Sequence, residues 1–319
     1  MAPLPTYPPA LGHERPLGGI AVDDHGNDRD IVARVLHEFS QIFPETTEDE
    51  LLRDLMPSTA KQKRTLRQWI ATEFFDDHLK RYSSNRRRAP IYWQLATPST
   101  SYSAWLYLHS LTKDTLFRLH TDFVAPKLAL EERKLDSMVR EASKPPTAQE
   151  LKTLAIQESF TEELRAFLVE VTLAATVWNP NVEDGVMINF APLWRLVPQH
   201  KPWQKELKST WDSLCEGEYD WARLAMHLWP ERVLPKCSTD RSLAIAHGLQ
   251  EVFWMLGEDG KWKPRPTPTR PVGELVRERS SAAVKAALKN LVETPTANPN
   301  GGRRRGGRSL ANVANGGVN

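Results

Sequence analysis

The sequence predicts a predominantly helical α+β protein that contains one small β-hairpin or sheet element. Apolar residues recur at helical spacing in several long stretches between residues 28 and 292. Two short segments rich in β-branched and aromatic residues, 90–97 and 102–109, flank the turn-forming tetrapeptide Pro98-Ser99-Thr100-Ser101. Six of the eleven tryptophans lie within residues 178–235, which predicts a Trp-rich module in the C-terminal half.

The N-terminal part is expected to be irregular or disordered over residues 1–27, because it is rich in proline and glycine. Asp28 can cap a helix that runs to Phe43, and Pro44 ends that helix. Thr47 begins a capping-box pattern that opens a short second helix.

A longer helix is expected from Ser58, with Leu66, Trp69 and Phe74 on its apolar face. This helix also carries four cations, which we interpret as an ordinary solvated helix face. They are Lys61, Lys63, Arg64 and Arg67.

Five cations directly precede the first predicted strand, and no acidic residue lies between them. They are Lys80, Arg81, Arg86, Arg87 and Arg88. Clustered arginine and lysine provide the sequence-independent attraction that a phosphate backbone requires. Together with Tyr92 and Trp93 of the adjoining strand, they predict a DNA-contact surface made of a basic edge on an aromatic hairpin. The alternative interpretation is a solvated charge run beside a core hairpin.

Two long helices are predicted within residues 112–177. The first begins at Thr112 or Asp114, and Pro126 is expected to kink or divide it. Thr147 opens the second helix. Because only a short Pro-containing connection separates them, the two helices are expected to pair antiparallel as a long helical spacer.

The Trp-rich segment 178–256 is expected to form an α+β module. One helix is predicted around Lys205–Cys215, and Ser238 or Asp240 can cap another that reaches Trp254. A Gly/Pro-rich linker and a last amphipathic helix follow within residues 257–293, and the Arg/Gly-containing tail 294–319 is expected to be disordered. The predicted divisions are therefore 1–27, 28–111, 112–177, 178–256, 257–293 and 294–319.

Bulk charge does not explain binding to a polyanion. The formal net charge is +2, and the last nineteen residues contribute four arginines and no acid. Without those four the chain has 38 basic and 40 acidic residues, so any attraction for DNA must come from local patches. Two cysteines without a CxxC pair fit a reduced cytosol, and no signal peptide or membrane-length apolar run is visible, so a cytoplasmic protein is expected.

Motifs for bound cofactors and catalysis are missing from the sequence. It contains no GxGxxG or GxxxxGKS phosphate-binding pattern, no GxSxG elbow and no Asn-Pro-Pro-aromatic motif of amino-methylating DNA enzymes. The nearest matches to the last motif, Asn179-Pro180-Asn181 and Asn298-Pro299-Asn300, are interpreted as turns. His227, Cys237 and His247 are too widely spaced for a recognised zinc pattern, so we expect no metal site.

Several long motifs resemble a known family of bacterial enzymes. They include RRRAPIYWQLATPSTSYSAWLYLH with KDTLFRL, NFAPLW, MHLWPERVLPK and DRSLAIAHG, spread over residues 30–256. The strings resemble the C-terminal region of PglX-like adenine-specific DNA methyltransferases, which belong to BREX and DISARM phage-defence systems.

The resemblance implies N6-adenine methylation of DNA with S-adenosylmethionine by the full-length enzyme, in a restriction-modification-like system. It also implies a non-catalytic C-terminal region that contacts double-stranded DNA and helps to choose the site. The family's cofactor-binding glycines and catalytic motif belong to an upstream domain, and they are missing here. We therefore carry over no catalytic or cofactor-binding residue, and we expect this chain alone to be inactive and to work with an upstream catalytic polypeptide or other defence-system proteins.

Two further functions remain open at the level of sequence. The exposed aromatics of residues 178–235 would dock on a partner defence protein if the chain were an interaction scaffold without DNA contact. An intact small enzyme would instead bind S-adenosylmethionine by itself.

Overall fold

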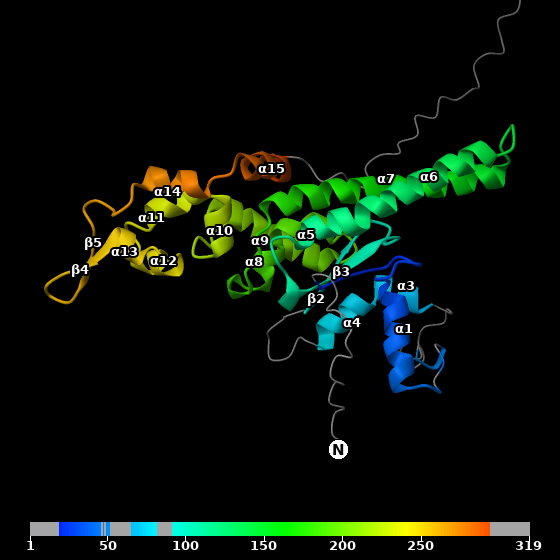
Figure 1. The fold of residues 1–319 in the computed structure, drawn as a ribbon, viewed down its shortest axis with the longest axis horizontal. Coiled ribbons are helices and arrows are strands. Elements are labelled where there is room, and N and C mark those ends of the chain that lie inside the picture. Colours follow the sequence, from blue (N-terminus) through cyan, green and yellow to red (C-terminus); the bar gives the residue numbers. More distant parts are fainter. Residues whose placement is uncertain (1–18, 46, 48, 52–64, 82–90, 294–319) are drawn as a thin grey trace, which may run out of the picture.

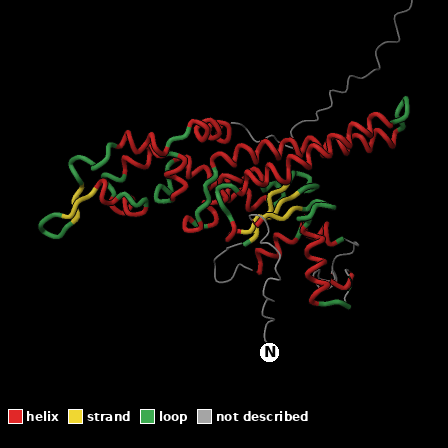
Figure 2. The backbone as a smooth tube through the Cα atoms, in the orientation of Figure 1, coloured by secondary structure: helices red, strands yellow, loops and turns green. Residues whose placement is uncertain are grey.

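The computed structural model describes residues 19–45, 47, 49–51, 65–81 and 91–293, and within these ranges it is mostly helical with two small antiparallel sheets (Figures 1 and 2). The strands are β1 (Ile20–Val22), β2 (Tyr92–Ala96), β3 (Ser103–Tyr107), β4 (Trp254–Leu256) and β5 (Trp262–Pro264). The helices of the first half are α1 (Ile31–Ile42), α3 (Leu66–Thr72), α4 (Phe74–Arg81), α5 (Thr115–Arg118), α6 (Ala125–Glu141) and α7 (Ala148–Val177). Those of the second half are α8 (Val186–Phe190), α9 (Lys201–Glu216), α10 (Arg223–Leu228), α11 (Pro230–Lys236), α12 (Arg241–Ala246), α13 (Gln250–Phe253), α14 (Val272–Arg279) and α15 (Ala282–Glu293).

The first sheet has the order β1-β3-β2, and both pairings are antiparallel. The predicted hairpin of β2 and β3 is confirmed, but the expectation that residues 1–27 are irregular is wrong for β1. Ile20 pairs with Leu106 and Val22 with Ala104, so β1 covers the free edge of β3. Three residues are too few for a period-2 pattern, and only the distant partner strand selects the extended conformation.

A glycine makes the entry into β1 possible. Gly19 has a φ of +70°, and a Cβ placed on it would lie 2.6 Å from the Cβ of Ser110. Only a residue without a side chain accepts both this conformation and this close approach.

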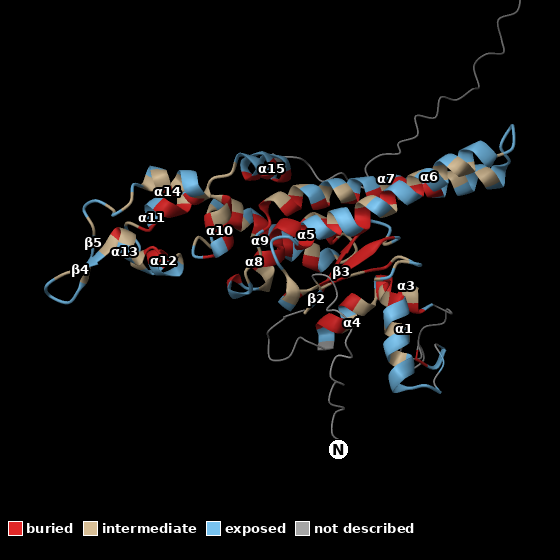
Figure 3. Cartoon of the chain, in the orientation of Figure 1, coloured by how far each residue is buried: buried red, intermediate tan, exposed pale blue. Residues whose placement is uncertain are grey.

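The first sheet lies between two groups of helices (Figures 1 and 3). On one side, the amide Nδ/ε group of Gln94 donates a hydrogen bond of 2.9 Å to the carbonyl of Ala71 in α3, and Trp105 packs on Phe74 of α4. On the other side, Trp93 stacks on Phe190 of α8. Aromatic and aliphatic side chains of both groups thus form one continuous buried core with the sheet at its centre.

Helices α6 and α7 form the predicted antiparallel pair, which extends from the body as an arm (Figure 1). Thr147 begins α7 with a complete capping box, in which Glu150 Oε2 accepts from the Thr147 backbone N–H at 2.7 Å. Pro126 does not break the helical path, because a π-helical stretch at Leu119–Val124 precedes it and Pro126 occupies the first turn of α6, where its missing N–H costs nothing.

The Trp-rich segment is helical from α8 to α13. Asp240 caps α12 as expected, with Oδ1 accepting from the Leu243 backbone N–H at 3.1 Å, but the predicted helix to Trp254 is divided at Gly248, whose φ is +65°. The segment interpreted as a Gly/Pro-rich linker contains a strand, because β5 pairs with β4. The expected last helix is two helices, α14 and α15.

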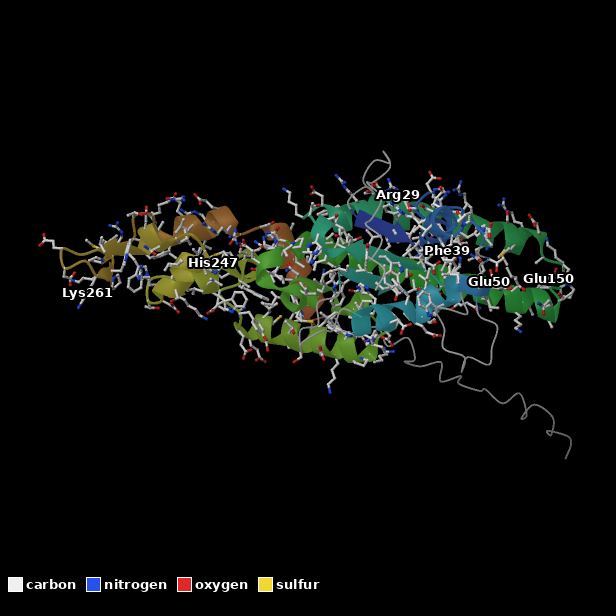
Figure 4. All side chains as sticks on the ribbon, turned by 90° about the horizontal axis from the view of Figure 1, so that it is seen from below. Arg29, Phe39, Glu50, Glu150, His247 and Lys261 are labelled. Atoms are coloured by element: carbon white, nitrogen blue, oxygen red, sulfur yellow. The ribbon has the colours of Figure 1, made fainter. Side chains whose placement is uncertain are left out.

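The molecule is elongated, with Glu150 at the tip of the arm and Lys261 of the β4–β5 turn near opposite ends (Figure 4). Among the described residues, no helix combines the length and the apolar character that crossing a bilayer requires.

Candidate nucleic-acid interface

The cationic run predicted to contact DNA lies between α4 and β2. Lys80 is in the last turn of α4 and its side chain is 76% exposed, with Nζ 3.4 Å from Asp77 Oδ1. An exposed pair of this kind contributes little to stability, so the ammonium group remains accessible to another anion. Arg81 is the last residue of α4, whereas Arg86, Arg87 and Arg88 lie outside the described residues.

His78 joins the end of α4 to the start of β2. Its Nε2 accepts hydrogen bonds from the backbone N–H groups of Ile91 and Tyr92, each 3.2 Å long. Burial lowers the pKa of His78 below its ordinary value of 6.5, which favours the neutral form that can accept these bonds. The two ends of the cationic run are therefore held close together on the surface of the body.

This arrangement predicts an acid-sensitive contact. A protonated imidazole has no lone pair for the Ile91 and Tyr92 N–H groups, and the folded pKa lies below the unfolded one. The stabilisation is therefore complete above pH 6.5 and is lost as the pH falls from 6.5 through the folded pKa. Urea unfolding between pH 7.5 and 5 should show that His78→Gln removes up to about 1.4 kcal/mol per pH unit of the wild-type slope. An unchanged slope would show that His78 does not titrate in this way, and His227→Gln, at a buried histidine in α10, serves as the control for general acid sensitivity.

Aromatic rings line the surface next to this junction. Tyr92 and Tyr107 are directly opposite in the β2–β3 register, with ring centroids 5.2 Å apart. His78 lies edge-on to Tyr92 at 5.5 Å, and His109 lies edge-on to Tyr107 at the same distance. Tyr92 is 39% exposed, so the structure places this predicted contact residue at the surface.

Trp93, also predicted to contact DNA, is a core residue. It is fully buried, it stacks on Phe190 at 4.2 Å with an interplanar angle of 13°, and its ring meets Trp203 edge-on at 5.4 Å. Trp105 is buried too. Successive side chains of a strand point to opposite faces, so exposed Tyr92 and buried Trp93 cannot share one surface. We therefore remove Trp93 from the DNA-contact set.

A group of buried ion pairs, missed from sequence, lies beside the other end of the sheet. Arg67 makes a two-pronged contact with Asp30, through Nη1–Oδ1 at 3.1 Å and Nη2–Oδ2 at 2.5 Å, and its Nη1 also contacts Asp23. The interpretation of Arg67 as part of a solvated helix face is therefore wrong. Lys61, Lys63 and Arg64, interpreted in the same way, lie outside the described residues.

The same group continues into the arm. Lys127 Nζ lies 2.7 Å from Asp24 Oδ1 and 2.8 Å from Glu131 Oε1, and the Gln157 amide donates to Glu131 Oε2 at 2.7 Å. Burial raises the pKa of Asp23 above its ordinary value, while Arg67 acts in the opposite direction. These contacts connect β1, α3, α6 and α7, and they border a cleft of about 380 Å³.

Residues of the other Trp-rich motifs have structural roles. The Asp184 carboxylate accepts from the backbone N–H groups of Arg223 and Leu224 at 3.0 and 2.9 Å, which satisfies the start of α10. The Trp178 indole donates to the Asn189 carbonyl at 2.7 Å, and Asn189 Oδ1 accepts from the Asn181 N–H at 2.7 Å. This network explains why aspartate, asparagine and tryptophan occur together in this segment without a catalytic role.

Metal-ligating and nucleophilic groups are not assembled into a site in the part of the chain that the structure describes. There, no group of three His, Cys, Asp or Glu side chains has an arrangement that could hold a metal ion. Burial raises the pKa of both Cys215 and Cys237 to about 11, which disfavours the reactive thiolate.

Comparison with known proteins supports the similarity noted in the motifs. No protein-family model matches the chain. It is 24% identical over 195 residues to the adenine-specific methyltransferase BrxX of Escherichia coli O9:H4 (strain HS), and 26% identical over 181 residues to the adenine-specific methyltransferase PglX of Lacticaseibacillus casei (strain Zhang). These alignments cover 56% and 53% of this chain, but only 16% and 15% of the two relatives. The chain is thus similar, over more than half of its length, to a limited part of two adenine-specific methyltransferases.

Proposed function

We propose that this chain is a DNA-contacting, non-catalytic portion of an adenine-specific DNA methyltransferase in a bacterial phage-defence system. The observation that carries the proposal is the similarity of more than half of the chain to about one sixth of two adenine-specific methyltransferases. The matched part is too small to be the whole enzyme, so methyl transfer is assigned to another segment or polypeptide.

The chemistry of the chain supports this division of work. The sequence has no glycine-rich cofactor turn and no Asn-Pro-Pro-aromatic motif, so S-adenosylmethionine and the reacting adenine are assigned to the catalytic part. Isothermal calorimetry of the isolated chain with S-adenosylmethionine should give no heat of binding. A saturable heat signal would instead favour an intact small enzyme.

Contact with DNA is assigned to the cationic run and its surroundings. Lys80 is exposed at the end of α4, Arg81 follows it, and Arg86, Arg87 and Arg88 complete the run before β2. Tyr92 flanks the run at the surface. Charged side chains of this kind position a protein on the phosphate backbone, and they give binding that weakens with salt.

Charge reversal tests this assignment. Fluorescence anisotropy with a labelled 20-base-pair duplex should show that Arg86→Glu, Arg87→Glu and Arg88→Glu together lower affinity about 100-fold or more at 0.1 M salt. The corresponding triple glutamine variant should reduce the slope of log affinity against log salt by about three, because each lost phosphate contact removes about one unit.

A matched control separates local contact from net charge. Arg133, Arg140 and Lys144 are exposed on the arm, and reversing all three changes the net charge by the same amount. We expect this variant to bind the duplex nearly as well as the wild type. Equal losses from both triple variants would contradict a specific role for the cationic run.

The interaction-scaffold alternative has less support than the sequence indicated. It requires exposed aromatics in residues 178–235, yet Trp178, Trp194, Trp203 and Trp211 are buried and Trp229 is half-buried. Trp221 is the exposed tryptophan of that segment. DNA contact is therefore the better use of the available surface.

A further inference from the structure

Two tyrosines at one end of the first sheet differ from the rest of their strands. Four of the five residues of β2 and four of the five of β3 are buried, whereas Tyr92 is exposed and Tyr107 is half-buried. The two rings face each other across the strands with an interplanar angle of 35°. The sheet thus presents a paired aromatic surface at the point where the covering helix α4 ends.

This surface is held in place from several directions. The Leu108 backbone N–H donates to the Ile91 carbonyl at 2.8 Å, which extends the β2–β3 pairing past the tyrosines. His78 holds the Tyr92 backbone and also lies against the Tyr92 ring, and His109 supports the Tyr107 ring. A preorganised aromatic surface loses little conformational entropy when a flat ligand stacks on it.

The charges nearby define the ligand. Lys80 is two residues from His78 and its ammonium group is exposed, and the arginines of the cationic run adjoin Tyr92 in sequence. Cations that can follow a phosphate backbone, next to aromatic rings on a sheet, are the combination that binds single-stranded nucleic acid. In a duplex the base faces are stacked on each other, so they are not available to the rings.

We propose that Tyr92 and Tyr107 form a stacking platform for unstacked nucleobases, so that the chain binds single-stranded DNA in addition to duplex. This inference rests on the proposed function, because an enzyme that modifies adenine must take the base out of the stack and thereby creates unstacked nucleotides. The platform would hold such a strand while the cationic run holds its phosphates.

The competing explanation is that the two tyrosines only stabilise the sheet as a cross-strand pair. The two roles make different demands on the side chains. A stabilising pair affects folding and leaves affinity for single strands unchanged, whereas a platform requires a ring at each position for binding.

The test compares a 12-nucleotide single strand with the duplex of the same sequence by fluorescence anisotropy. We expect Tyr92→Ala and Tyr107→Ala each to lower single-strand affinity by about 5- to 150-fold, with much smaller losses for duplex. Tyr92→Phe keeps the ring and should stay within about threefold of the wild type. Phe117→Ala, at an exposed aromatic of α5, should change neither affinity.

The outcomes for this inference and for the proposed function are distinguishable. If both alanine variants keep wild-type single-strand affinity while the wild type still binds duplex, the platform is wrong and the proposed function stands. If the wild type binds neither form, both fail.

Photocrosslinking provides a second test that needs no variant. An oligonucleotide containing 5-iododeoxyuridine should crosslink to the wild-type chain at Tyr92 or Tyr107, as mapped by mass spectrometry. Crosslinks confined to other segments would overturn the proposal even where an alanine variant proves too unstable to study.

Discussion

Replacing Trp93 by alanine should lower the free energy of unfolding by about 3–5 kcal/mol, measured by urea denaturation. Trp93 has no exposed surface, and its ring contacts aromatic rings of α4, α8 and α9. Truncation would remove the buried ring and leave a cavity between helices that are distant in sequence. Because the contacts connect both halves of the chain, we expect the whole protein to unfold at a lower urea concentration.

Two controls distinguish this role from a role in DNA contact. The Trp93 indole N–H has no hydrogen-bond partner, so Trp93→Phe loses only part of the buried ring and should cost about 1–2 kcal/mol. Trp93→Phe should also keep wild-type affinity for duplex DNA. A large loss of affinity in a stably folded Trp93→Phe protein would contradict the core assignment.

Replacing Arg67 by methionine should lower the free energy of unfolding by about 3–5 kcal/mol at pH 7. The change leaves Asp23 and Asp30 without their shared cation, and both carboxylates are nearly inaccessible to solvent. Unpaired buried carboxylates have pKa values above their ordinary range, so the folded variant takes up protons more readily than the unfolded chain. The loss should therefore shrink as the pH is lowered from 7 towards 4.

The pH dependence is the specific signature of this prediction. A deficit that stays constant from pH 7 to 4 would indicate lost packing in place of lost charge pairing. Lys80→Met provides the matched control, because it also removes a cation paired with an aspartate but at an exposed site, and it should change stability by less than about 1 kcal/mol.

Elements defined by local patterns were predictable from sequence. Alternation and turn residues identified β2 and β3, and helical periodicity with the cap at Thr147 identified the paired helices α6 and α7. In each case the determining residues lie within a few positions of one another, so the sequence contains the information locally.

Elements that depend on distant partners were not predictable. Strand β1 exists because β3 pairs with it, and Arg67 is buried because Asp23 and Asp30, 44 and 37 residues away, surround it. The burial of Trp93 likewise depends on Phe190 of a different module. No signal in the neighbouring residues separates these contacts from a solvated cation or an exposed aromatic ring.

The candidate interface was partly predictable. Charge and aromatic content located the cationic run and Tyr92, whereas the roles of His78 and Tyr107 require the β2–β3 register and the position of α4. The alternation of strand faces could have separated Tyr92 from Trp93, because adjacent strand residues point in opposite directions.

The position of β1 also has a consequence for biosynthesis. Ile20 pairs with Leu106, a residue made 86 positions later. At a translation rate of about 5–20 residues per second, the first strand waits roughly 4–17 s before its neighbour emerges from the ribosome. Its short length and flanking polar residues limit the sticky surface shown during that interval, and the growing polypeptide closes its sheet only when the order of synthesis has supplied the central strand.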